Sequence, residues 1–201
     1  DGYADFTIRK VGKVTDELFN LKKGSNIFIR GCYGNGWPTE QLKGKNVVII
    51  AGGTGVSPVK SLINQLYSEP GYAKEIYLIL GFKNSQSILF TDELEQWKQA
   101  GHFHVICTLD NEDYPGWNKG MVTEFVKEIP FSSFGGNYEC LVVGNLQQKA
   151  FWNIRFPRIK SGCPLRGKCP APSANADIAE LTKLMSVWTG LYLIIRSEKN
   201  W

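Results

Sequence analysis

Histidine is scarce in this sequence, with two residues among 201, and this limits the chemistry that the chain can perform. His102 and His104 alternate with Phe103 at the entry to an apolar segment, a placement typical of solvated strand residues rather than of catalysts or metal ligands. We find no convincing general acid or base and predict no catalytic residue. Reactions whose chemistry is carried by cofactors stay open, because there the protein mainly aligns the reactants.

Long apolar runs, clustered basic residues and a cysteine framework are also missing. No stretch reaches the roughly 18 apolar residues of a membrane span, and the start does not look like an export signal. The net charge is +4 and the Lys and Arg residues are scattered, which argues against a nucleic-acid partner. Five cysteines are an odd number without the spacing of a secreted, disulfide-linked fold. We therefore expect a soluble cytoplasmic protein without a membrane span.

From residue 43 onward the sequence alternates apolar strands with amphipathic helices, which is typical of a parallel sheet with crossover helices. The run at 47–51 is continuously apolar, as expected for a strand covered on both faces. Further strands are expected at 76–80, 103–108, 140–144 and 191–195, and helices at 59–67, 91–99, 120–129 and 177–185. Residues 43–201 are thus predicted to form an α/β domain with a doubly wound, parallel five-stranded sheet. An atypical Cys- and Pro-containing segment at 146–175 interrupts this pattern.

Residues 1–42 have a different pattern. Alternation at 6–11 and a short apolar run at 27–30 predict strands, separated by turn residues around Gly24. Two or three strands cannot bury a core alone, so we interpret 1–42 as the C-terminal part of an antiparallel β-barrel whose earlier residues are missing from this chain. The alternative is an N-terminal hairpin packed on the next domain.

The strongest local motif is the glycine-rich turn at 51–58, Ala-Gly-Gly-Thr-Gly-Val-Ser-Pro, between the first buried strand and the following helix. Glycines there let the backbone approach a pyrophosphate, whose charge is met by free N–H groups and by the helix N-terminus. A tight strand-to-helix turn also needs glycine for backbone reasons alone. The motif is not the usual dehydrogenase fingerprint, because Pro58 replaces its third glycine and the second strand ends in Lys83 rather than an acidic residue.

Several motifs in the right order and spacing resemble the ferredoxin-NADP reductase superfamily. They are the segments 11–15, 30–36, 52–58, 81–83, 88–94, 120–123 and 142–145. The resemblance covers about residues 5–151, and these motifs look most like the flavin-linked subunit of anaerobic sulfite reductase. The electron-transfer subunits of dihydroorotate dehydrogenase and of sulfhydrogenase-type hydrogenases are similar as well.

The resemblance implies an NAD(P)H-dependent flavin oxidoreductase that is a subunit of a larger reductase complex. NADH would deliver a hydride to FAD, and electrons would pass to a partner that reduces sulfite to sulfide. The alternatives are a dihydroorotate dehydrogenase or hydrogenase partner, or a nucleotide-binding interaction module without redox activity. We expect NADH because residues 81–90 contain no arginine to hold a 2′-phosphate, whereas Lys83 keeps NADPH as the alternative.

The resemblance also implies which residues bind the cofactors. On the FAD side, within a flavin-binding barrel, they are Gly12, Thr15, Gly31, Tyr33 and Gly34. In the dinucleotide turn and beside it they are Gly52, Gly53, Thr54, Gly55 and Lys83. On the nicotinamide side of the crevice they are Thr108, Leu109, Asp110, Gly144 and Asn145. The alternative is that these strand ends are only loops and line no ligand site.

Related subunits end in a Cys-x4-Cys-x2-Cys motif, with a fourth cysteine further on, that holds a two-iron two-sulfur cluster. The candidate metal ligands here are Cys163 and Cys169, but Cys163 is one residue too far away and Pro172 takes the third position. Two thiolates cannot complete a four-cysteine site, so we expect a cluster only if the intact protein supplies further ligands. The flavin-stacking Arg-x-Tyr/Phe-Ser motif of the family would precede residue 1.

Overall fold

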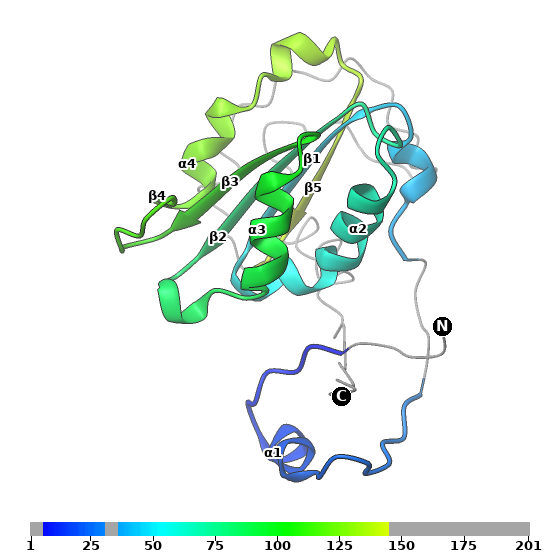
Figure 1. Cartoon of the computed structure of the whole chain (residues 1–201), viewed down its shortest axis with the longest axis vertical. Helices are drawn as coiled ribbons and strands as arrows, with labels where there is room; N and C mark the ends of the chain where they lie inside the picture. Colours follow the sequence, from blue (N-terminus) through cyan, green and yellow to red (C-terminus); the bar gives the residue numbers. More distant parts are fainter. Residues whose placement is uncertain (1–5, 31–35, 145–201) are drawn as a thin grey trace, which may run out of the picture.

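A parallel sheet forms the centre of the protein in the computed structural model, which describes residues 6–30 and 36–144. Its five strands have the order β4-β3-β2-β1-β5, and every neighbouring pair is parallel (Figure 1). The strands are β1 (Asn46–Gly52), β2 (Glu75–Phe82), β3 (Phe103–Leu109), β4 (Asn118–Lys119) and β5 (Tyr138–Val143). The predicted parallel five-stranded sheet is therefore confirmed.

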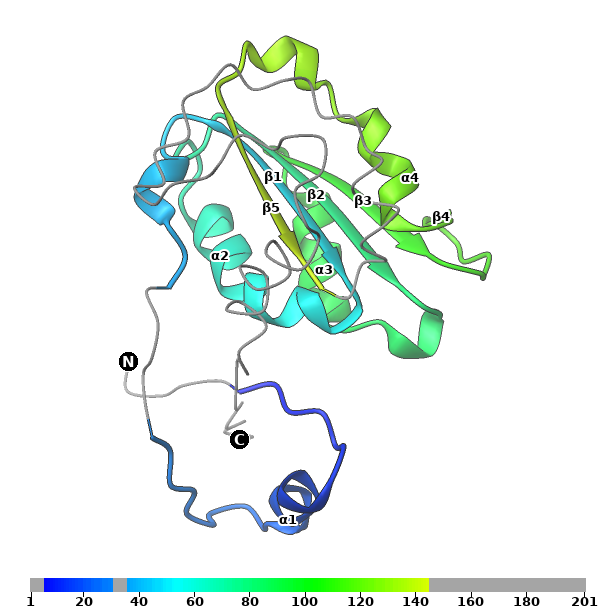
Figure 2. The ribbon, with the colours of Figure 1, turned by 180° about the vertical axis from the view of Figure 1, so that it is seen from behind.

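Helices cover both faces of this sheet. Helices α2 (Val56–Ser68) and α3 (Thr91–Gln99) lie in front of it in Figure 1 and behind it in Figure 2. The short helix α4 (Val122–Phe125) packs on the opposite face. Strand β1 contributes Val47 and Ile49 to the core under α2 and α3, and Val48 and Ile50 to the core under α4. This double coverage explains why its sequence is apolar without alternation.

The strands and helices of the central region begin and end close to their predicted positions, with two differences. The helix expected at 120–129 is α4 followed by a 3-10 turn, Val126–Glu128. Strand β4 is two residues long and was not predicted, because a strand that short carries no periodic signal. The strand predicted at 191–195 lies outside the described residues. No helix in the described part of the chain is long and apolar enough to cross a membrane.

Residues 6–30 lie apart from the sheet in both ribbon views (Figures 1 and 2). The strands expected at 6–11 and 27–30 are not formed, and the regular element between them is helix α1 (Lys13–Asn20). None of the residues in α1 is buried, and Phe28 is 97% exposed. A strand needs a partner for its backbone groups, and no other described segment pairs with 6–30. The assignment of 1–42 to a barrel stays a prediction.

Candidate dinucleotide site

The glycine-rich turn leads directly from β1 into α2. Gly52 ends the strand, a 3-10 turn spans Gly53–Gly55, and α2 begins at Val56. Pro58 is in the first turn of α2, where a backbone N–H has no intrahelical acceptor and its loss costs nothing. The indole N–H of Trp37 donates to the Pro58 carbonyl oxygen at 3.0 Å and so fixes this turn from outside.

The glycines of the turn have two separate roles. A Cβ on Gly55 would lie 2.5 Å from the Val143 carbonyl oxygen, and a Cβ on Gly144 would lie 2.5 Å from the Gly52 carbonyl oxygen. These glycines therefore allow the ends of β1 and β5 to pack backbone against backbone. Gly53 differs, because it has φ +55° and open space where its Cβ would be, and the neighbouring Thr54 is exposed. Gly53 and Thr54 are the residues that a ligand can reach.

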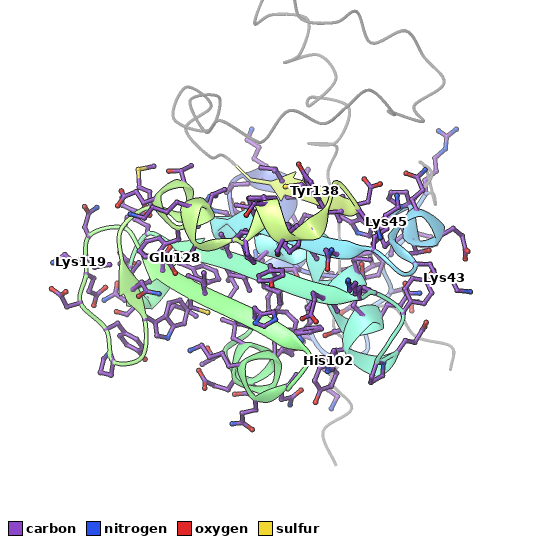
Figure 3. The ribbon with its side chains drawn as sticks, turned by 90° about the horizontal axis from the view of Figure 1, so that it is seen from above. Lys43, Lys45, His102, Lys119, Glu128 and Tyr138 are labelled. Carbon is purple, nitrogen blue, oxygen red and sulfur yellow. The ribbon has the colours of Figure 1, made fainter. Side chains whose placement is uncertain are left out.

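The strand order places this turn at the topological switch point of the sheet. The chain leaves β1 through α2 to reach β2 on one side, whereas β5 pairs with β1 on the other. In open α/β sheets ligands bind outside the carboxyl ends of the strands at this point. Lys119, at the end of β4, lies at the opposite end of the sheet from Lys45 and His102, which precede β1 and β3 (Figure 3).

Lys83 and Asp110 lie together at the carboxyl ends of β2 and β3. The Asp110 backbone N–H donates to the Phe82 carbonyl oxygen at 3.0 Å, which joins the two strand ends. Partial burial raises the pKa of the Asp110 carboxyl, and the nearby Lys83 charge opposes that rise. The Lys83 cation, the candidate partner of a 2′-phosphate, therefore lies near a carboxylate.

Thr108 does not line the crevice as expected. Its side chain is completely buried, and its hydroxyl has no hydrogen-bond partner among the described residues. It faces Gly81, where an added Cβ would lie 2.7 Å from the Thr108 hydroxyl oxygen and would also clash with Val122. The side chain points to the face under α4 because strand residues alternate, and so it contributes no surface to a ligand.

Two residues that the family resemblance placed together on the nicotinamide side lie apart in the structure. Asp110 follows β3 and Gly144 follows β5, and β2 and β1 lie between these strands. With a spacing of about 4.8 Å between neighbouring strands, the two ends are roughly 14 Å apart. Asp110 lies with Lys83 on one side of β1, whereas Gly144 packs against the glycine turn on the other.

Glu112 was not predicted from sequence, yet its carboxylate binds Ser85 from a loop 27 residues away. Neither residue belongs to a motif, and only the parallel pairing of β2 with β3 brings them together. The same loop contains Tyr114 and Trp117, whose rings pack edge to face with their centroids 5.8 Å apart. No sequence signal identifies the Glu112–Ser85 contact, because it depends on strand order.

The residues expected on the FAD side are described only in part. The Thr15 hydroxyl accepts hydrogen bonds from the backbone N–H groups of Val11 and Gly12 and donates to the Gly12 carbonyl oxygen, which fixes the start of α1. A Cβ added to Gly12 would meet nothing within 4 Å, so the start of this exposed helix is open to solvent. Gly31, Tyr33, Gly34, Asn145 and the metal candidates Cys163 and Cys169 lie outside the described residues.

Cys107 and Cys140 are in β3 and β5, and burial raises their thiol pKa values to about 11 and about 12. They stay protonated at neutral pH and act as small apolar residues of the sheet rather than as nucleophiles or ligands. Within residues 6–30 and 36–144, no three side chains of His, Cys, Asp or Glu gather as a metal site would require.

Comparison with known proteins agrees with this geometry. The chain is 35% identical over 169 residues to a probable dihydroorotate dehydrogenase B (NAD(+)) electron transfer subunit of Pyrococcus furiosus, covering 81% of this chain and 62% of that protein. It is 41% identical over 87 residues to sulfhydrogenase 2 subunit gamma of the same organism, covering 43% and 30%. It is 28% identical over 149 residues to NADH-cytochrome b5 reductase 2 of Candida albicans, covering 71% and 49%. The chain thus spans 30% to 62% of the length of these relatives.

Solved structures show the same fold. A mutant ferredoxin-NADP+ reductase of Plasmodium falciparum in complex with 2′P-AMP has a TM-score of 0.51 at 23% identity, covering 65% of this chain and 56% of that one. A flavohemoglobin of Malassezia yamatoensis has a TM-score of 0.50 at 20% identity, covering 67% and 34%. The family described as "Oxidoreductase NAD-binding domain" matches residues 49–150, which contain the glycine turn and all five strand ends. The chain therefore belongs to the oxidoreductase NAD-binding domain family, with the fold that this domain has in ferredoxin-NADP+ reductases.

Proposed function

We propose that this chain is the nicotinamide-dinucleotide-binding part of an electron-transfer reductase subunit, which passes a hydride from NADH to FAD and electrons onward to a partner. The observation that carries the proposal is the glycine turn, in which Gly53 and Thr54 are open to a ligand at the switch point of a parallel sheet. Oxidoreductase relatives with the same domain support it.

The chain's own residues bind and orient the dinucleotide in this proposal. The N-terminus of α2 and the backbone N–H groups around Gly53 hold the pyrophosphate. The adenosine ribose lies toward β2 and β3, where the Asp110 carboxylate accepts its hydroxyl hydrogens, and the nicotinamide lies beyond β1 toward Gly144. No acid or base from the chain is required, because hydride transfer is chemistry that the two cofactors supply.

FAD is compatible with the described residues but is held in large part by others. Gly12, at the start of α1, is open to solvent, and the Thr15 hydroxyl keeps that start in a fixed shape. We propose Gly31, Tyr33 and Gly34 as further contacts. An iron-sulfur cluster needs more ligands than Cys163 and Cys169, because Cys107 and Cys140 are committed to the sheet.

The relatives change the partner that we propose. The sequence motifs favoured anaerobic sulfite reductase, whereas the relatives described above are named for dihydroorotate dehydrogenase and sulfhydrogenase. We therefore propose a dihydroorotate dehydrogenase partner, since that relative aligns with 81% of this chain. A hydrogenase partner is the second candidate, because the sulfhydrogenase relative has the higher identity over its shorter match.

Assays of the intact protein together with each catalytic partner test the assignment. The flavin band in its visible spectrum should bleach on addition of NADH. The complex should then couple the oxidation of NADH to the reduction of orotate. A protein without a flavin band would be a nucleotide-binding module without redox activity. Coupling to hydrogen or to sulfite, in place of orotate, would show that the partner is wrong while leaving the dinucleotide site intact.

A further inference from the structure

Glu112 joins two loops that are distant in sequence. One carboxylate oxygen accepts the Ser85 backbone N–H at 2.7 Å, and the other accepts the Ser85 hydroxyl at 2.8 Å. Ser85 begins the 3-10 turn Ser85–Ser87 after β2, and Glu112 lies three residues after the end of β3. Both loops are at the carboxyl edge of the sheet, on the side of β1 where we place the adenosine ribose.

Hydrogen bonds between Asn84 and Ser87 hold the loop after β2 in shape, and Ser85 between them binds Glu112. The Ser87 hydroxyl accepts the Asn84 N–H at 3.0 Å and donates to the Asn84 carbonyl oxygen at 2.7 Å. Ser85 is the part of this turn whose N–H and hydroxyl bind outside it. Both hydrogen bonds lower the pKa of Glu112, the bond from the Ser85 backbone N–H more than the bond from its hydroxyl. The carboxylate therefore stays charged at neutral pH.

The contact fixes the residues between β3 and Glu112 at two points. At one point the Asp110 N–H binds the Phe82 carbonyl oxygen at 3.0 Å, and at the other Glu112 binds Ser85. The partly buried Asp110 and the exposed Asn111 lie between them. The next carboxylate, Asp113, accepts a hydrogen bond from Lys119 of β4 at 2.6 Å, and among the described residues it makes no hydrogen bond to the loop after β2.

We propose that Glu112 is a positioning residue, which binds Ser85 so that Asp110 and Asn111 face the adenosine ribose of the dinucleotide. This inference rests on the proposed function and specifies how the adenosine half is recognised. Two fixed points hold the ribose-facing residues in one arrangement before the ligand arrives, which saves ordering entropy on binding. The nicotinamide side, beyond β1, is untouched by this contact.

Rapid-mixing kinetics on the intact flavoprotein test the proposal. Glu112→Ala and Ser85→Ala should weaken NADH binding, seen as a Kd about fivefold higher for Glu112→Ala and less for Ser85→Ala, which keeps its backbone N–H. The limiting rate of flavin reduction should not change, because the nicotinamide side is intact. The inhibition constant of ADP-ribose should rise in parallel with the NADH Kd.

Matched variants separate positioning from general damage. Asp113→Asn removes the neighbouring carboxylate of the same loop and should leave NADH binding unchanged, and Ser85→Thr should retain wild-type affinity through its hydroxyl. Unchanged affinity in Glu112→Ala, or an equal fall in affinity and in limiting rate in both alanine variants, would overturn the positioning role. If NADH fails to reduce the flavin of the wild-type protein, the proposed function itself is wrong.

Discussion

Single glycines decide whether the turn after β1 can hold a pyrophosphate. Gly53 has a left-handed backbone and an open Cα, whereas Gly55 and Gly144 are glycines because two backbones touch there. The turn could be predicted from sequence as a unit, because a strand, three glycines and a helix are all local signals. Sequence alone could not tell the ligand-facing glycine from the packing glycines. The packing role depends on contact with β5, which lies about 90 residues further along the chain.

Gly53→Val tests the ligand-facing role. The variant should weaken NADH binding by at least about tenfold, because its side chain occupies the open space beside the pyrophosphate. A β-branched residue at φ +55° also costs about 1–3 kcal/mol of stability. Gly44→Val is the matched control, because Gly44 has φ +69° and equally open space but precedes β1 at the other end of the sheet. Calorimetric titration should show weaker binding only in Gly53→Val; equal Kd values in the two variants would remove Gly53 from the site.

Gly55→Ala tests the packing role. The added methyl would lie 2.5 Å from the Val143 carbonyl oxygen, and two backbones cannot move apart without disturbing the β1–β5 pairing. We expect a loss of about 1–3 kcal/mol in the free energy of unfolding, measured by urea denaturation. Gly101→Ala, with nothing within 4 Å and no positive φ, should change stability by less than about 0.5 kcal/mol. A Gly55→Ala protein as stable as the wild type would show that the ends of β1 and β5 do not touch.

Asp110→Asn tests cofactor choice. Removing the carboxylate removes its repulsion of a 2′-phosphate and leaves Lys83 free to attract one, so the preference for NADH over NADPH should fall roughly tenfold. The measurement is the ratio of kcat/KM for the two nucleotides in the intact protein. Asp113→Asn makes the same charge change at another aspartate of the loop after β3, and it should leave the ratio unchanged. A preference that survives in Asp110→Asn would place the selective group elsewhere.

At the scale of whole elements, the apolar pattern was enough for the buried strands and insufficient at the N-terminal end of the described chain. Strand β1 spans Asn46–Gly52 against a prediction of 47–51, because a fully buried strand has an unmistakable composition. No helix was predicted within residues 13–20, yet they form α1, with Thr15 binding the backbone at its start. The alternation at 6–11 is a short pattern without a described partner, and pairing is non-local.

The start of α3 shows how tertiary contacts override a local signal. Threonine is a residue typical of helix caps, but Thr91 is the first residue of α3, and Phe90 occupies the capping position with a left-handed backbone at φ 59°. Lys60 of α2 lies 4.3 Å above the Phe90 ring and forms an ion pair with Glu93 in the first turn of α3. This contact between helices offsets the cost of the unusual backbone conformation, and no window of sequence contains both helices.

At the scale of the molecule, strand order determines which parts of the site meet. The sequence pattern predicted the parallel sheet and the glycine turn, whereas the family resemblance grouped Asp110 with Gly144 on the nicotinamide side. The order β4-β3-β2-β1-β5 puts them on opposite sides of β1 and gives the site two distinct sides. The ribose-facing side then includes Glu112 and Ser85, which sequence alone could not connect.

A crystal structure of the intact protein with bound NAD+ tests the central claim most directly. We predict the pyrophosphate over Gly53 and Thr54 at the start of α2, the adenosine ribose beside Asp110, and the nicotinamide beyond β1 toward Gly144. A dinucleotide bound at the amino edge of the sheet, near Lys45 and His102, or one whose pyrophosphate makes no contact with the glycine turn, would contradict the account.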